Sequence, residues 1–216
     1  MSGPPRSAVE RLPQPGRGDE VGRADVVLVN MPFAAVERPS LGLGQLKALL
    51  SAASIDAAVV YPNLRFAAMA GAHSYQMLGR MSMHDYVLEW VFTAAAFPDF
   101  IGGNSWPFRR WVANLDETLV ERIVPGGDRN DVWQKLLRLR AEAPAFVRDT
   151  AIEILAQQPR IVGCTSTFQQ HVASLALLRS IRELQPSVIT MMGGANCETR
   201  MGLATHKSYE WVDYVV

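Results

Sequence analysis

Five short apolar runs, separated by stretches with helical periodicity, constrain the fold of this 216-residue chain more than any other feature. The first two runs read DVVLVN and AAVVY, and they are rich in β-branched residues that favour strands. The stretch between them begins after Ser40, a residue type that commonly caps a helix. A strand–helix–strand rhythm predicts parallel strands joined by right-handed crossovers. We therefore expect an α/β fold.

The expected sheet has five parallel strands in the doubly wound order 2-1-3-4-5. We place the strands at residues 25–30, 57–61, 161–165, 188–192 and 212–216. The helices that follow the first, third and fourth strands are expected at residues 41–53, 169–184 and 198–205. Because the sequence stops on an apolar strand, we expect it to be a fragment of a longer protein.

The segment between the second and third strands is far longer than a crossover requires. It runs from about residue 72 to residue 158 and contains helix candidates at 84–97, 106–124 and 131–158, with Pro144 marking a kink or break in the third. We interpret it as a large helical insertion in one domain of residues 24–216. Residues 1–23 are rich in Pro, Gly and charge, which predicts a disordered tail.

Composition excludes several classes of function. The 21 basic and 21 acidic residues give no net charge, which argues against nucleic-acid binding, because a phosphate backbone attracts a basic surface. No apolar run reaches the roughly 18–20 residues of a membrane span, and the N-terminus lacks the apolar core of a signal peptide. Two cysteines form no disulfide framework, so we expect a reducing, cytoplasmic setting.

Small and polar residues follow three of the predicted strands. In open parallel sheets, ligands bind beyond the carboxyl ends of the strands where the strand order reverses. Glycines there let a ligand approach the backbone, and hydroxyls can donate to it. The candidate cofactor-binding residues are Asn30, Met31, Pro32, Ser40, Leu41 and Gly42 after the first strand, Thr165, Ser166, Thr167, Phe168 and Gln169 after the third, and Gly193, Gly194, Ala195 and Asn196 after the fourth. Alternatively, the glycines form tight turns and the hydroxyls cap the next helices.

Other familiar sites are not indicated. The chain has neither the GxGxxG fingerprint of dinucleotide-binding folds nor the GxxxxGK[ST] phosphate loop. Cys164 and Cys197 are 33 residues apart, and the spacing of His171 and His206 does not complete a metal site with them. We therefore predict no metal ligands and no catalytic residues. Arg65 is a candidate to pair with a ligand phosphate or to form a surface salt bridge.

Two of the strand-end motifs resemble those of cobalamin-binding domains. Ser166 and the pair Gly193-Gly194 stand 27 residues apart, as the S-x-L and G-G elements of those domains do. Phe168 replaces the Leu of S-x-L. Where D-x-H-x-x-G would follow the first strand, residues 30–35 read NMPFAA, so no histidine is present there to ligate cobalt.

A resemblance over most of the chain is more specific. Several segments together resemble the N-terminal part of cobalamin-type radical S-adenosylmethionine proteins that mature ribosomally synthesised peptide natural products. These segments are VNMPFAAVERPSLGLGQLKALL, YPNLRFA, EWVFTAAAF, GCTSTFQQHVASLALLRSIRELQP and GGANCE. The resemblance implies a flavodoxin-like, cobalamin-binding-like domain that holds cobalamin with no protein ligand to cobalt, in an enzyme whose relatives often methylate unactivated carbon.

The resemblance also implies partners. A C-terminal radical S-adenosylmethionine domain of the parent protein would hold the iron–sulfur cluster and S-adenosylmethionine, and a precursor peptide would be the substrate. This chain lacks the CxxxCxxC triplet that binds such a cluster, so both groups are expected only in the parent. The chain alone is not expected to be catalytic.

Three hypotheses remain open from the sequence. The first is a cobalamin-binding module, and the second is a degenerate domain that serves as a scaffold or recognises a precursor peptide. A free-standing flavodoxin-like domain for another nucleotide is the third, and the missing phosphate loop counts against it. The first two differ in one structural feature, which is whether a cavity lies between the first and third strands or whether Phe33 and Phe168 fill it.

Overall fold

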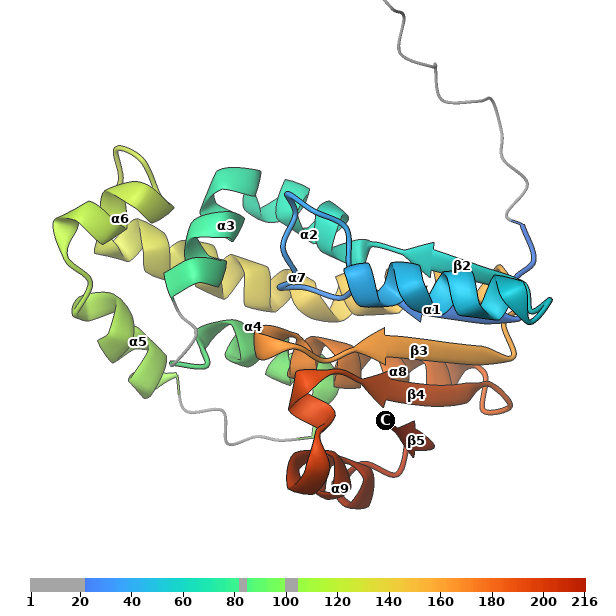
Figure 1. The fold of residues 1–216 in the computed structure, drawn as a ribbon. Helices are drawn as coiled ribbons and strands as arrows, with labels where there is room; N and C mark the ends of the chain where they lie inside the picture. Colours follow the sequence, from blue (N-terminus) through green and yellow to red (C-terminus); the bar gives the residue numbers. More distant parts are fainter. Residues whose placement is uncertain (1–21, 82–84, 100–104) are drawn as a thin grey trace, which may run out of the picture.

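The computed structural model describes residues 22–81, 85–99 and 105–216. In these residues, five parallel strands form one sheet in the order β2-β1-β3-β4-β5 (Figure 1). The strands are β1 (Val26–Val29), β2 (Ala57–Val60), β3 (Ile161–Thr165), β4 (Ile189–Gly193) and β5 (Tyr214–Val215). The predicted doubly wound α/β fold is therefore confirmed, and so is its strand order.

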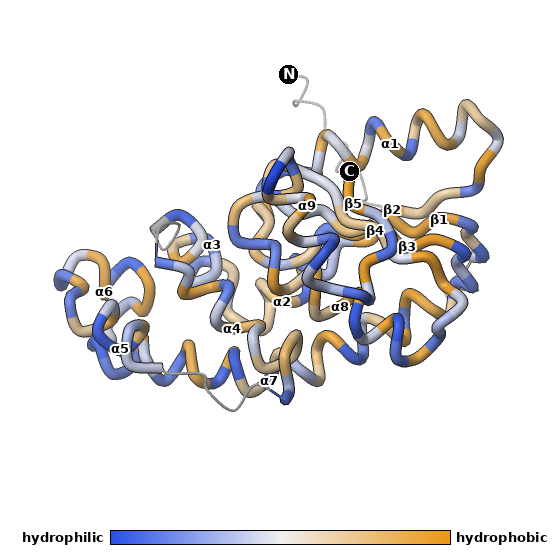
Figure 2. Tube along the Cα trace, turned by 90° about the horizontal axis from the view of Figure 1, so that it is seen from below, coloured by the Kyte–Doolittle hydropathy of each residue, from blue (hydrophilic) through white to orange (hydrophobic). Residues whose placement is uncertain are grey.

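Helices cover both faces of the sheet. They are α1 (Leu41–Ala52), α2 (Pro62–Ala70), α3 (Ala72–Met81), α4 (Val87–Ala96), α5 (Trp106–Ala113), α6 (Glu117–Ile123), α7 (Arg129–Leu155), α8 (His171–Leu184) and α9 (Thr199–Ser208). Two short 3-10 turns, η1 (Phe168–Gln170) and η2 (Ala195–Cys197), follow β3 and β4. Helix α1 lies on one face, which we call the front face, whereas α2, α7 and α8 lie on the opposite, back face (Figure 2).

The alternation of side chains along β1 separates the two faces. Val26 and Leu28 point to the front face and pack with Leu43 of α1, while Val27 and Val29 belong to the large back-face core. All four residues of β1 are buried, because β1 is central and paired with β2 and β3. A buried parallel strand therefore reads as a continuous apolar run.

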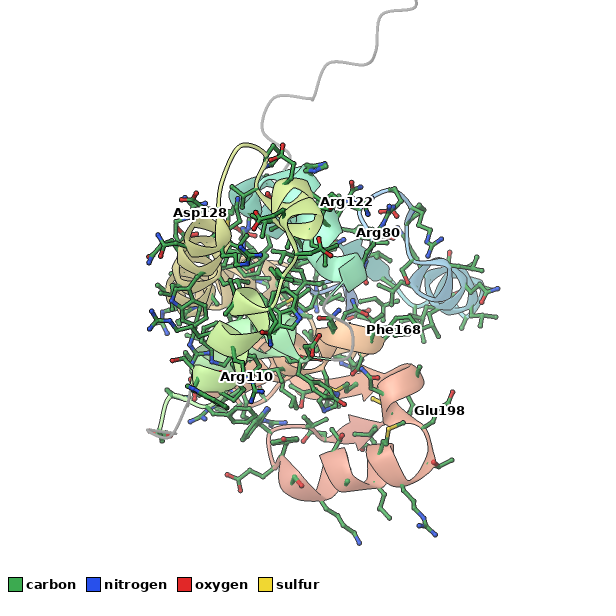
Figure 3. The ribbon with its side chains drawn as sticks, turned by 90° about the vertical axis from the view of Figure 1, so that its left-hand side faces the viewer. Arg80, Arg110, Arg122, Asp128, Phe168 and Glu198 are labelled. Atoms are coloured by element: carbon green, nitrogen blue, oxygen red, sulfur yellow. The ribbon has the colours of Figure 1, made fainter. Side chains whose placement is uncertain are left out.

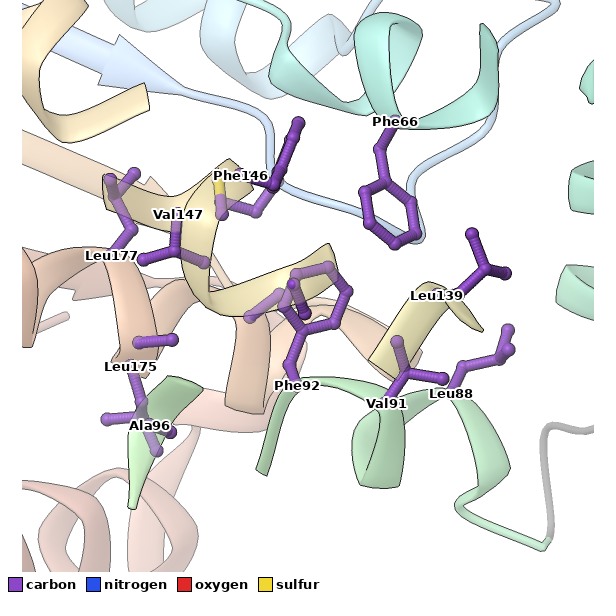
Figure 4. Close-up of a cluster of buried hydrophobic side chains, with 14 of the residues drawn as sticks. Phe66, Leu88, Val91, Phe92, Ala96, Leu139, Phe146, Val147, Leu175 and Leu177 are labelled. Atoms are coloured by element: carbon purple, nitrogen blue, oxygen red, sulfur yellow. The ribbon is translucent and has the colours of Figure 1, made fainter. Parts of the chain in front are cut away.

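The back-face core is aromatic and closely packed. Phe66 of α2 lies 5.0 Å from Phe92 of α4 and 4.9 Å from Phe146 of α7, measured between ring centroids (Figure 4). Leu175 and Leu177 of α8 extend the same cluster and have no exposed surface. The helices between β2 and β3 thus complete the core of the sheet.

Two predicted helices differ in detail. The expected helix at residues 106–124 is two helices, α5 and α6, because the Asp116 carboxylate accepts a hydrogen bond from the Leu119 backbone N–H at 2.8 Å and starts a new helix. Pro144 does not break α7, which is 27 residues long and continues through this position. Its neighbours Ala143, Phe146 and Val147 are buried in the core, so packing offsets the lost backbone hydrogen bond.

The sequence did not predict α2 and α3. No helix was expected directly after the second strand, but Pro62 occupies the first turn of α2, where its missing N–H has no helical partner to lose. The expected disordered tail lies outside the described residues except for residues 22 and 23, and so does residue 84 at the start of the expected helix 84–97. No helix in the described part of the chain is both long and apolar enough to cross a membrane.

Candidate functional site

A cavity of about 490 Å³ lies on the front face, between α1 and the sheet. It extends from the first residues of β1 and β3 to the carboxyl ends of β3 and β4. Its lining residues are Val26, Leu28, Ser40, Gly42, Leu43, Leu46, Leu50, Ile161, Gly163, Cys164, Thr165, Thr167, Met191, Met192, Gly193, Gly194 and Val216. We call it the front cavity, and its size is typical of sites that bind small molecules.

The front cavity exists because α1 packs loosely and because glycines on the sheet beneath it carry no side chains to fill the space. Leu43 is the one buried residue of α1, and Leu46 keeps 47% of its surface exposed. Gly163 and Gly193 carry no side chain on the floor of the cavity. A Cβ at residue 163 would lie 3.4 Å from Leu28 Cδ2 and 4.0 Å from Met191 Cβ, which are ordinary contact distances, so a small side chain fits there.

The structure brings together part of the predicted site. The predicted residues that line the front cavity are Ser40, Gly42, Thr165, Thr167, Gly193 and Gly194. Phe168 and Gln169 line a second cavity, and the remaining ones, Asn30, Met31, Pro32, Leu41, Ser166, Ala195 and Asn196, line neither of the two. Sequence reasoning missed the rest of the lining, including Leu28, Leu46, Gly163 and Met191. A glycine within an apolar strand was the available signal, because it weakens a strand unless something packs closely against it.

Most of the predicted hydroxyl ligands already have partners within the protein. Ser40 Oγ accepts a hydrogen bond from the Leu43 N–H at 3.4 Å, which caps α1. Thr167 caps η1 through the backbone of Gln170, and Thr165 Oγ1 lies 3.2 Å from Asn30 Oδ1. These contacts are the capping and turn roles that the sequence left open as an alternative. The other side chains that line the front cavity are mostly apolar.

Gln170 ties the ends of the two central strands together. Its buried Nε2 donates to Asn30 Oδ1 at 3.0 Å and to the Met31 carbonyl at 2.9 Å. Its Oε1 accepts from the Thr167 N–H at 3.2 Å. Asn30 and Met31 therefore fix the loop after β1 at the point where the strand order reverses.

Ser166 faces away from the front cavity. Its side chain is fully buried, and its Oγ lies 2.7 Å from His171 Nδ1 and 3.3 Å from the Asn196 Nδ2 that donates to it. Burial lowers the pKa of the His171 imidazole. A glycine is required at residue 194, beside Ser166, since its φ is +123° and a Cβ there would approach the Ser166 carbonyl oxygen to 2.7 Å.

Neither phenylalanine in question fills the front cavity. Phe33 stacks on Tyr75 at 5.0 Å and meets Phe66 edge-on at 5.6 Å, which places it against the back-face core. Phe168 is 68% exposed. A cavity is therefore present over β1, β3 and β4, and neither phenylalanine is part of its lining.

Glu89 of α4 reaches the start of α8. Its carboxylate accepts hydrogen bonds from the backbone N–H groups of His171 at 3.1 Å and Val172 at 2.7 Å. Burial raises the pKa of this carboxyl group to about 7, while the two hydrogen bonds act in the opposite direction. Glu89 thus links the helices between β2 and β3 to the loop after β3.

Of the remaining candidates, Cys164 lines the front cavity and Arg65 does not. In the described residues, no cluster of three or more His, Cys, Asp or Glu side chains is arranged to hold a metal ion. Cys164 is buried, and burial raises the pKa of its thiol. Arg65 forms a salt bridge with Glu153 and a hydrogen bond with Thr150, which is the surface-pair alternative.

Comparison with known proteins adds no relative. No protein-family model matches the chain, and no curated protein or solved structure does so either. The geometry and chemistry of the described residues therefore carry the functional argument.

Proposed function

We propose that this chain is a cobalamin-binding module of a radical S-adenosylmethionine enzyme that matures a ribosomally synthesised peptide. In this proposal, the nucleotide tail of cobalamin enters the front cavity from the carboxyl ends of β3 and β4. Cobalt receives no protein ligand, because residues 30–35 contain no histidine. The cofactor supplies a carrier for a methyl group, and a separate C-terminal domain supplies the iron–sulfur cluster and S-adenosylmethionine.

The observation that carries the proposal is the shape and lining of the front cavity. It is an apolar slot of about 490 Å³ that reaches the carboxyl ends of β3 and β4, beside bare glycine backbone at Gly193 and Gly194. A flat aromatic base fits such a slot, because glycines allow a ring to lie against the main chain. The fit is to the base of the tail, since the cavity offers few polar side chains that lack an internal partner.

The chain's own residues would bind and shield the tail. Leu28, Leu43 and Met191 would contact the base and exclude water from it. Thr167 and Ser40 also line the cavity, and their hydroxyls can still donate to a polar group while accepting their capping hydrogen bonds. We also propose the cytoplasm as the location, because both cysteines are free and buried.

The first test is a titration of the purified chain with hydroxocobalamin and with methylcobalamin, followed by visible absorption and calorimetry. We expect saturable binding and a spectrum in which no base or histidine ligates the lower face of cobalt. A folded chain that binds neither form at high micromolar concentration would contradict the proposal and favour the second candidate, a scaffold or precursor-peptide recognition domain.

A substitution on the floor of the front cavity sharpens the test. Gly163→Val adds a β-favouring side chain at a position where a Cβ makes ordinary contacts only, so the chain should fold while the slot is blocked. We expect at least a tenfold loss of cobalamin affinity, and a similar loss for Leu46→Gln on the opposite wall. Gly44→Ala, on the exposed side of α1, is the matched control and should bind normally. Unchanged binding by both cavity variants would exclude the front cavity as the site.

A further inference from the structure

A second cavity, of about 370 Å³, lies at the carboxyl edge of the sheet on the other side of the loop that follows β1. One wall is that loop, the second is α3, and η1 closes the base. Its lining residues are Phe33, Ala34, Ala35, Val36, Glu37, Arg38, Tyr75, Gln76, Gly79, Arg80, Phe168 and Gln169. We call it the edge cavity, and it shares no lining residue with the front cavity.

Phe168 presents an aromatic ring at the edge cavity at a conformational cost. Its φ is +52°, a left-handed conformation that is strained for a bulky residue, and its side chain is 68% exposed. The Asn196 side chain donates to the Phe168 carbonyl at 2.7 Å and helps to hold this conformation. Figure 3, which views the carboxyl edge of the sheet, shows Phe168 and Arg80 on this side of the molecule. Neither burial nor a core contact accounts for an exposed ring in a strained turn.

The charges around the edge cavity are unbalanced. Glu37 pairs with Arg80 at 3.5 Å, and hydrogen bonds from its own and the Val36 backbone, together with Arg80, lower the pKa of the Glu37 carboxyl group. Arg38 is exposed, and no ion pair within the described residues involves it. One guanidinium therefore remains available beside an aromatic and aliphatic surface. A guanidinium binds a carboxylate through charge-assisted hydrogen bonds.

We propose that the edge cavity binds an aromatic ring with a carboxylate close to it. The ring would stack on Phe168 and contact the side chains of the loop after β1, while the carboxylate would pair with Arg38. Either a free aromatic amino-acid derivative or an acidic residue beside an aromatic one in a peptide carries this chemistry. The proposal does not depend on cobalamin, because the two cavities have separate linings.

The test uses three small probes on the whole chain, with affinity measured by ligand-observed NMR and calorimetry. N-acetyl-phenylalanine carries the ring and the carboxylate, and its amide lacks the charge. The blocked tripeptide acetyl-Asp-Phe-Gly-amide carries both groups in a peptide. We expect the amide to bind about tenfold more weakly than the acid, because it loses the charge-assisted pair. Tighter binding of the tripeptide would identify a peptide as the natural source, and tighter binding of the free acid would identify a small molecule.

Three substitutions locate the binding. Arg38→Gln should reduce the affinity for N-acetyl-phenylalanine to that for its amide, whereas Lys47→Gln, which removes an exposed charge on α1, should not. Gly79→Leu should abolish binding of every probe, because a Cβ at residue 79 has nothing within 4 Å and the side chain would enter the cavity. Gly163→Val should leave this binding intact. Absence of binding to the wild-type chain at millimolar probe, or binding unaffected by Arg38→Gln and Gly79→Leu, would overturn the proposal.

Discussion

The two faces of the sheet are built from the same strands but packed to different degrees. On the back face, α2, α7 and α8 bury alternate strand residues under a continuous layer of aromatic and aliphatic side chains, and α4 packs against α7 and α8. On the front face, α1 contributes one fully buried residue, Leu43, and leaves the front cavity beside it. The back face therefore supplies most of the stability, and the front face supplies the space for a ligand. The comparison suggests four measurements, ordered from the largest expected effect to the smallest.

A pair of leucine truncations tests the difference in packing directly. Leu177→Ala removes a fully buried side chain from the back face and should lower the free energy of unfolding by about 2–5 kcal/mol. Leu46→Ala on the wall of the front cavity should cost about 1 kcal/mol or less, because that side chain is already 47% exposed. Urea denaturation measures both values. Equal losses would mean that the front face is packed as tightly as the back.

Glu89 should make stability depend on pH. Its pKa is raised from 4.5 to about 7 in the folded protein, so between these values the folded state keeps a proton that the unfolded state releases. Stability should therefore fall as the pH rises through this window. Relative to the wild type, the stability of Glu89→Gln should rise by on the order of 3 kcal/mol between about pH 4.5 and pH 8. Denaturation curves at both pH values measure this change. If the stability difference between the variant and the wild type were the same at both pH values, the α8 N-terminus would fully stabilise the carboxylate.

Two glycines, Gly163 within β3 and Gly194 directly after β4, should respond differently to the same substitution. Gly194→Ala should destabilise the protein by about 1–3 kcal/mol, since the residue has a positive φ and a Cβ would approach the Ser166 carbonyl. Gly163→Ala should change stability by less than about 1 kcal/mol, because its Cβ would make only ordinary contacts with Leu28 and Met191. Thermal unfolding compares the two variants. A large loss for Gly163→Ala would indicate that the floor of the front cavity is not open.

The smallest effect is expected at the cap of α1. Ser40→Ala removes the side chain that accepts from the Leu43 N–H and should cost about 0.5–1 kcal/mol. Because α1 packs loosely, the loss should appear locally, as faster amide hydrogen exchange in the first turn of α1 and no change in α7 or α8. Faster exchange throughout the molecule would contradict the independence of the front face.

The fold was predictable because its signals are local. The run DVVLVN is apolar throughout because β1 is buried on both faces, and the cap at Ser40 is confirmed by its hydrogen bond. The helices α2 and α3 were missed, since Pro62 looks like a strand terminator in sequence and acts as the first turn of a helix in the structure. Similarly, Pro144 looked like a break, but α7 continues through it because its neighbours are buried.

The candidate site was predictable only in part. The sequence placed the loops after β1, β3 and β4 at one edge of the sheet, because parallel strands end on the same side. It did not show which way each side chain turns in those loops. Ser166 points inward to His171, and Phe168 points outward, although they are two residues apart. Hydrogen bonds from Asn196, which is about thirty residues further along the chain, fix both.

By itself, the sequence determined the class of fold, the order of the strands and the edge of the sheet at which polar residues gather. These follow from hydrophobic periodicity and from the geometry of parallel crossovers, which are properties of short segments. Only the tertiary structure decided that the front face is open, that Gly163 lies on its floor and that most hydroxyls are already paired. These features depend on how closely α1 approaches the sheet, and that distance is set by side chains from several elements packing together.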